Sequence, residues 1–79
     1  MNPLGMNLLQ ATKAKVEGEI KIAEANLKIL LENPVGIGEH VDLAADVYCL
    51  VDTITAKSDM LNKVNCIIDS QVTNEIWSS

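Results

Sequence analysis

The chain has 79 residues, which is enough for one small domain with a small core. Its net charge of −5, with six lysines and no arginine, excludes the clustered positive charge that nucleic-acid binding requires. No apolar run approaches the ~20 residues that span a bilayer, so we expect neither a nucleic-acid partner nor a membrane span.

The first six residues contain two that interrupt regular structure. Pro3 and Gly5 lie in a segment without helical periodicity. Chain ends that are not tied down by packing are commonly poorly ordered. We therefore predict that residues 1–6 form a flexible arm ahead of the first helix.

Apolar residues recur with helical spacing between residues 7 and 32, which predicts the first helix. One seam follows a heptad repeat, and its core candidates are Val16, Ile20, Ala23, Leu27 and Leu30. At about 100° per residue a second stripe lies on nearly the opposite side, and its members are Ala11, Ala14, Gly18, Ile22, Ala25 and Ile29. The first helix is therefore expected to be apolar on two faces.

Gly18, inside this second stripe, has two interpretations. A glycine costs about 1 kcal/mol relative to alanine inside a helix, and close approach of another helix would give a packing reason for it. Alternatively, Gly18 is a tolerated surface glycine. The sequence leaves both interpretations open.

Turn-forming residues separate the first helix from the second. The segment 33–40 contains Asn33, Pro34, Gly36 and Gly38. Proline ends the helical hydrogen-bond ladder, and glycine permits positive φ where the chain reverses. We predict a loop over residues 33–40 that makes the flanking helices antiparallel neighbours.

A second helix is predicted over residues 41–75, followed by a tail at 76–79. Its core candidates again follow a heptad repeat, and they are Leu43, Val47, Leu50, Ile54, Leu61, Val64 and Ile68. Only Lys57 interrupts this seam, and Asp42 near the helix start suits the positive end of the helix dipole. A weaker second stripe includes Cys49, Met60 and Ile67.

The predicted fold is all-α, with two long antiparallel helices in a single domain over residues 1–79. One hairpin covers one seam on each helix and leaves the second stripes uncovered. A second copy docked on these stripes gives a four-helix bundle with twofold symmetry. We therefore expect a homodimer or higher oligomer, with the second stripes as its candidate interface.

Candidate chemistry is confined to the end of the loop. Glu39, His40 and Asp42 offer metal-ligating atoms, but capping of the second helix and hydrogen bonding within the loop are the simpler roles. Glu39 and Asp42 also show the E-x-x-D spacing of all-α metal-dependent nucleotide pyrophosphatases, without the E-x-x-E pair that those enzymes need. We predict no enzyme activity, metal or cofactor, and keep a pyrophosphatase-like enzyme as an alternative.

The two cysteines indicate a cellular compartment. Cys49 and Cys66 lie in one predicted helix at a separation of about 25 Å, which no disulfide spans. Unpaired cysteines without a signal-peptide pattern favour a reducing cytoplasm. A disulfide between two copies stays open.

The segment Leu31-Glu32-Asn33-Pro34-Val35-Gly36-Ile37-Gly38-Glu39-His40, between two helices, resembles small uncharacterised proteins of marine tailed bacteriophages and ocean metagenomes. In those proteins a proline tends to follow the histidine, whereas this chain has Val41. The resemblance implies a helical hairpin of phage origin in the host cytoplasm, and it implies no activity.

The functional hypothesis is a non-enzymatic interaction module that binds itself or a host protein. An alternative is an acidic regulator or inhibitor of a host enzyme, because aspartates outnumber lysines in the second helix.

Overall fold

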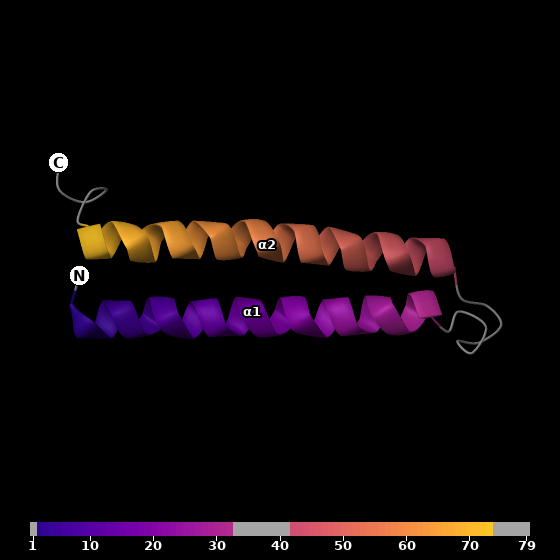
Figure 1. The fold of residues 1–79 in the computed structure, drawn as a ribbon, viewed down its shortest axis with the longest axis horizontal. Helices are drawn as coiled ribbons and strands as arrows, with labels where there is room; N and C mark the ends of the chain where they lie inside the picture. The colour runs from indigo at the N-terminus through magenta and orange to yellow at the C-terminus, as the bar shows by residue number, and fades with distance from the viewer. Residues whose placement is uncertain (1, 33–41, 74–79) are drawn as a thin grey trace.

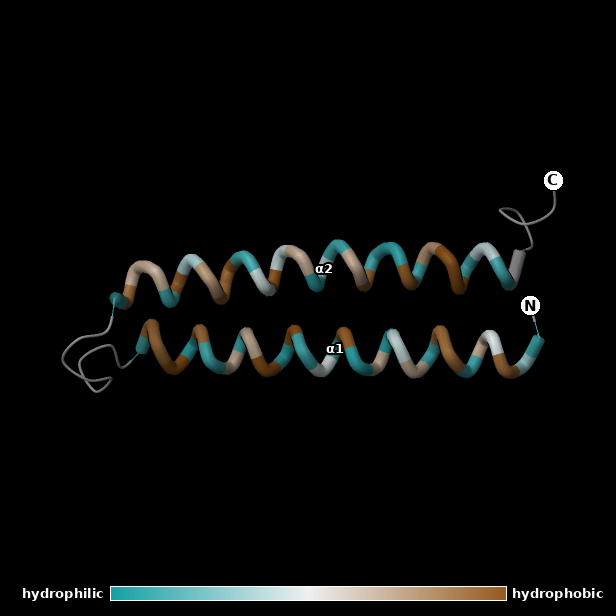
Figure 2. The backbone as a smooth tube through the Cα atoms, turned by 180° about the vertical axis from the view of Figure 1, so that it is seen from behind, coloured by the Kyte–Doolittle hydropathy of each residue, from teal (hydrophilic) through white to brown (hydrophobic). Residues whose placement is uncertain are grey.

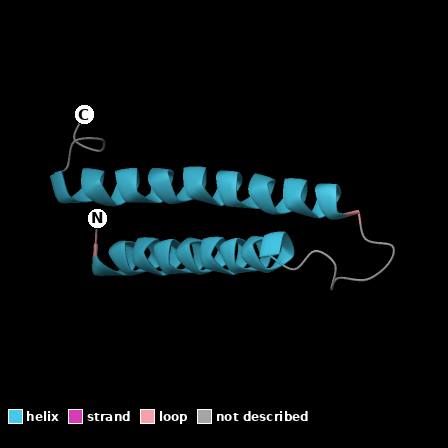
Figure 3. Ribbon diagram, turned by 45° about the vertical axis from the view of Figure 1, so that its right-hand side comes forward, coloured by secondary structure: helices cyan, strands magenta, loops and turns pink. Residues whose placement is uncertain are grey.

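The computed structural model describes residues 2–32 and 42–73, and both parts are almost entirely helical. Helix α1 spans Pro3–Glu32 and helix α2 spans Leu43–Thr73. The helices lie side by side in opposite directions, with the start of α1 beside the end of α2 (Figure 1 and Figure 3). The predicted all-α helical hairpin is confirmed.

Helix α1 begins earlier than the sequence predicted, and a side-chain cap explains why. The Oδ1 atom of Asn2 accepts a hydrogen bond of 2.8 Å from the backbone N–H of Gly5, and the Asn2 carbonyl accepts one of 3.1 Å from Met6. Pro3 then occupies the first helical position, where its missing N–H costs nothing. The prediction of a flexible arm over residues 1–6 is therefore wrong from Pro3 onward.

Helix α2 begins with a cap of the same kind. The Oδ1 atom of Asp42 accepts a hydrogen bond of 3.0 Å from the backbone N–H of Ala45, and the Asp42 carbonyl accepts one of 3.0 Å from Asp46. The cap places the first helical residue at Leu43 instead of residue 41. Asp42, one of the predicted loop and capping residues, thus supplies the cap of α2.

The predicted loop lies outside the described residues, which leave out 33–41 and 74–79. The predicted loop and capping residues Asn33, Pro34, Gly36, Gly38 and His40 are therefore outside the described part of the chain. The predicted end of the second helix at residue 75 and the tail at 76–79 also lie outside the described part.

The core is a single row of aliphatic side chains between the two helices. Val16, Ala23 and Leu30 are buried at intervals of seven residues along α1, and Val64 is buried on α2. The other predicted core residues are half-buried, and they are Ile20, Leu27, Leu43, Val47, Leu50, Ile54, Leu61 and Ile68. The heptad seams therefore face each other, as expected for two helices that pack along their length.

Figure 2 shows hydrophobic segments on the side of α1 that faces α2 and also on the side that faces away. A neighbouring helix covers only one of these sides. The hairpin has overall extents of 56 × 20 × 16 Å, so it is long and only one helix pair thick. Much of its apolar surface consequently stays in contact with solvent.

The caps can be tested by substitution of Asp42. The Asp42→Ala variant should lower the free energy of unfolding by about 1 kcal/mol, because the N–H of Ala45 loses its side-chain acceptor. Urea denaturation followed by circular dichroism measures this change. Asp52→Ala, at an exposed position within α2, should stay within about 0.5 kcal/mol of the unmodified protein. Equal losses in both variants would show that Asp42 does not act as a cap.

The orientation of α1 can be tested with two adjacent leucines. Leu30 is 7% exposed and Leu31 is 61% exposed. Leu30→Ala should cost about 2–5 kcal/mol, which is most of what a core of this size supplies, whereas Leu31→Ala should cost little. Thermal denaturation by circular dichroism measures both, and similar melting temperatures for the two variants would contradict the orientation of α1.

Candidate interaction surface

The second stripe predicted on α1 is uncovered in the structure. Ile22 is 64% exposed and Ile29 is 58% exposed, although both are large aliphatic residues. Ala11, Ala14 and Ala25 are also exposed, and Gly18 is half-buried. On α2, Cys49 and Met60 are exposed and Ile67 is half-buried.

Two further exposed leucines extend this stripe toward the start of α1. Leu4 is 66% exposed and Leu8 is 62% exposed. Leu4 was missed because the helix was expected to begin at residue 7, whereas Leu8 lies inside that predicted helix and was left out because the predicted stripe began at Ala11. The signal that would have found Leu4 is the Asn2-Pro3 pair, which is typical of a helix cap followed by a first helical residue.

These residues together define what we call the outer seam of α1. Successive members are separated alternately by four and by three residues. The members are Leu4, Leu8, Ala11, Lys15, Gly18, Ile22, Ala25 and Ile29. This is the spacing of a heptad repeat over nearly the whole helix. Lys15 is its only charged member, and Ala14 lies beside it. The outer seam has the pattern of a helix-packing surface, and α2 as the structure describes it does not cover this seam.

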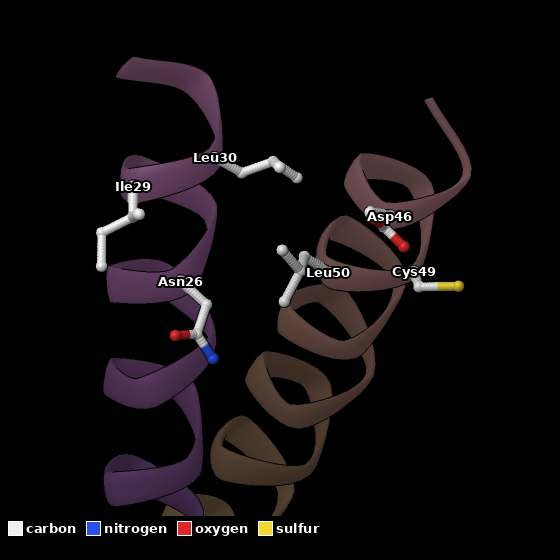
Figure 4. A pocket seen from close by; sticks show the side chains of 6 residues that line it. All are labelled: Asn26, Ile29, Leu30, Asp46, Cys49 and Leu50. Carbon is white, nitrogen blue, oxygen red and sulfur yellow. The ribbon is translucent and has the colours of Figure 1, made fainter. Parts of the chain in front are cut away.

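A groove runs between α1 and α2 beside the outer seam. It consists of two adjoining hollows of about 380 and 360 Å³, and Asn26 and Leu50 line both of them. In the first hollow, Leu30 and Leu50 project between the helices, whereas Ile29 and Cys49 project outward from α1 and α2 (Figure 4). The groove is therefore shallow, apolar at its base and continuous with the outer seam.

An ion pair crosses the second hollow. The Lys57 Nζ atom lies 3.4 Å from the Glu19 Oε1 atom, and both side chains are partly exposed. Lys57 is the charged residue that interrupts the core seam of α2. Its aliphatic stem stays at the seam while its ammonium group reaches the rim of the groove. The pair joins the two helices, and an exposed pair of this kind contributes about 0–1 kcal/mol to stability.

The described residues contain no group of three or more histidine, cysteine, aspartate or glutamate side chains that could hold a metal ion. Glu39 and His40 lie outside the described residues, and Asp42 caps α2. Cys49 and Cys66 are free thiols, both exposed on α2.

A smaller apolar surface lies on another side of α2. Tyr48 is 73% exposed, and with Val51 it lines a hollow of about 480 Å³ formed by α2 alone. Neither residue belongs to the predicted interface. This surface is shorter than the outer seam, and Asp52 at its edge interrupts it.

Neither described helix is long and apolar enough to cross a membrane. Comparisons with protein-family models, curated proteins and solved structures found no match to this chain. The surface geometry is therefore the basis for a functional proposal.

Gly18 offers a direct test of whether the hairpin itself needs a glycine. A Cβ atom placed on Gly18 meets no atom within 4 Å, so alanine fits without rearrangement. Gly18→Ala should raise the free energy of unfolding by about 0.5–1 kcal/mol, because alanine is the better helix former. Urea titration at high dilution measures this without a contribution from association. Ala25→Gly should have the opposite effect, and a loss of stability in Gly18→Ala would contradict the open space at this position.

Proposed function

We propose that this chain is a non-enzymatic interaction module whose partner is a second copy of itself, joined through the outer seam of α1. Two hairpins then form a four-helix assembly with twofold symmetry. The observation that carries the proposal is the outer seam, a heptad repeat that ends at Ile29 and is exposed along nearly its whole length.

The surface area supports a need for a partner. The chain exposes 5809 Å², whereas a compact monomer of this mass exposes about 4,700 Å². The excess of roughly 1,100 Å² exceeds the ~800 Å² that each partner buries in a standard protein interface. Burial of the outer seam would bring the chain close to the exposed area of an ordinary globular protein.

The charge distribution also favours the outer seam over the other sides of α1. Glu17, Lys21, Glu24 and Lys28 lie on the remaining solvent-facing side, where they can stay hydrated. Only Lys15 would need to be accommodated within the contact. A closed twofold contact of this kind uses the same surface on both copies, so the outer seam of neither copy stays free to bind a third.

The resemblance of the loop segment to proteins of marine tailed phages remains a prediction about origin. Within this proposal it places the assembly in an infected bacterial cell. It names no further partner.

A single charge in the outer seam should separate the copies. The unmodified protein should have the mass of a dimer in size-exclusion chromatography with light scattering, at tens of micromolar. Ile22→Lys should have the mass of a monomer, because two ammonium groups would lie in an apolar contact. Its circular dichroism spectrum should remain helical, since Ile22 is 64% exposed within one hairpin.

Tyr48→Lys is the matched control, because Tyr48 is 73% exposed but lies on α2 outside the outer seam. This variant should remain dimeric. A monomeric mass for the unmodified protein at its highest soluble concentration would refute self-association. If Tyr48→Lys were monomeric while Ile22→Lys stayed dimeric, the contact between the copies would lie on α2 and not on the outer seam.

A further inference from the structure

We propose that the two α1 helices pair antiparallel, so that Lys15 of each copy lies over Gly18 of the other and reaches Glu19 beside it. This inference rests on the proposed self-association and specifies its direction and register. The outer seam lies nearly opposite the core seam of α1, so the two α1 helices form the centre of the assembly and the two α2 helices lie outside.

Side-chain size along the outer seam favours the antiparallel direction. A heptad seam alternates two kinds of position, called a and d. In an antiparallel pair, each a position of one helix faces a d position of the other helix. Leu8 then faces Ala25 of the second copy, and Ala11 faces Ile22. These two layers each combine a large and a small side chain, which fills the space evenly.

A parallel pair would place each residue opposite its own copy. The Ala11, Gly18 and Ala25 layers would then contain only small side chains and would be underfilled. The two Lys15 ammonium groups would also occupy one layer, which adds repulsion between like charges. Both effects disfavour the parallel direction.

The register follows from the length of the outer seam. When Leu4 faces Ile29 of the second copy, every position of the outer seam has an opposite residue. A shift by one heptad leaves either Leu4 and Leu8 or Ala25 and Ile29 unpaired. The central register therefore buries the most apolar surface.

Charge complementarity agrees with this register. Lys15 is the only charged residue of the outer seam, and it faces Gly18, which has no side chain to obstruct the lysine stem. The next residue of the second copy is Glu19, whose carboxylate already forms an ion pair with Lys57 of its own chain, with 3.4 Å between Lys57 Nζ and Glu19 Oε1. In the assembly this carboxylate lies between two ammonium groups, one from each copy.

In this register, no two residues of the same charge face each other across the two copies at the positions that flank the outer seam. Lys28 lies on the same edge as Asn7 of the second copy, and Lys21 lies on the same edge as Ala14, each two residues away from a level position. Glu19 is the only acidic residue at a flanking position, and it is the one near Lys15. The contact is therefore compatible with the charges on both of its edges.

Cross-linking between two differently tagged copies tests the direction and register. Cys49 and Cys66 are exposed, so both can be replaced by alanine to give a cysteine-free background. Leu8→Cys is introduced in one tagged copy and Ala25→Cys in the other. The mixed copies are treated with a short bismaleimide, and the products are identified by mass. The antiparallel register predicts that most of the product joins Leu8→Cys to Ala25→Cys.

A second pair avoids any change to the outer seam. Asn7→Cys and Lys28→Cys are both exposed edge positions, and they should also cross-link to each other. Leu8→Cys mixed with Tyr48→Cys is the matched control, because Tyr48 lies on α2. This control should give only the low background of random collisions.

The possible results separate this inference from the proposed function. Products that join Leu8→Cys to itself and Ala25→Cys to itself would overturn the antiparallel register while the dimer stands. A dimeric mass with no cross-link at either pair would overturn α1 as the contact. A monomeric mass of the cysteine-free protein at its highest soluble concentration would overturn both proposals.

Discussion

The fold of this chain is governed by the limited surface that one helix can cover on another. A helix is a cylinder, and a single neighbour shields only the stripe that faces it. In this hairpin the shielded stripe is the row that includes Val16, Ala23 and Leu30. The apolar residues on the far side of α1 therefore remain in water, whatever the strength of the contact between the two helices. The proposals on assembly follow from this one geometric limit.

The sequence was sufficient to predict the helical hairpin, because heptad spacing depends only on the local geometry of a helix. It was less successful at the start of α1. Pro3 and Gly5 were interpreted as interruptions, whereas Asn2 turns the same segment into a capped helical start. The error also hid Leu4, since residues outside a predicted helix cannot be assigned to one of its faces. A breaker residue thus has to be interpreted together with the residue that precedes it.

The pairing of Glu19 with Lys57 could not be predicted from spacing. Residues on different helices meet only when the axial offset between those helices is known, and that offset depends on the connection and on packing along the entire seam. The groove that contains Asn26 and Leu50 is hidden from the sequence for the same reason. The nine residues predicted as the interface were assigned by helical position alone, and the structure leaves seven of them exposed. Their use in a contact remains a proposal.

Lys57 has a consequence for the uniqueness of the hairpin. A regular heptad seam fits its neighbour almost equally well after a slip of seven residues, or about 10 Å along the axis. A slip of that size would carry the ammonium of Lys57 away from Glu19 and place it beside Thr12 or Asn26, neither of which is charged. One charged residue in an otherwise apolar row thereby penalises sliding that hydrophobic contact alone would tolerate. Lys57 thus interrupts the apolar seam of α2 and also favours the alignment in which it pairs with Glu19.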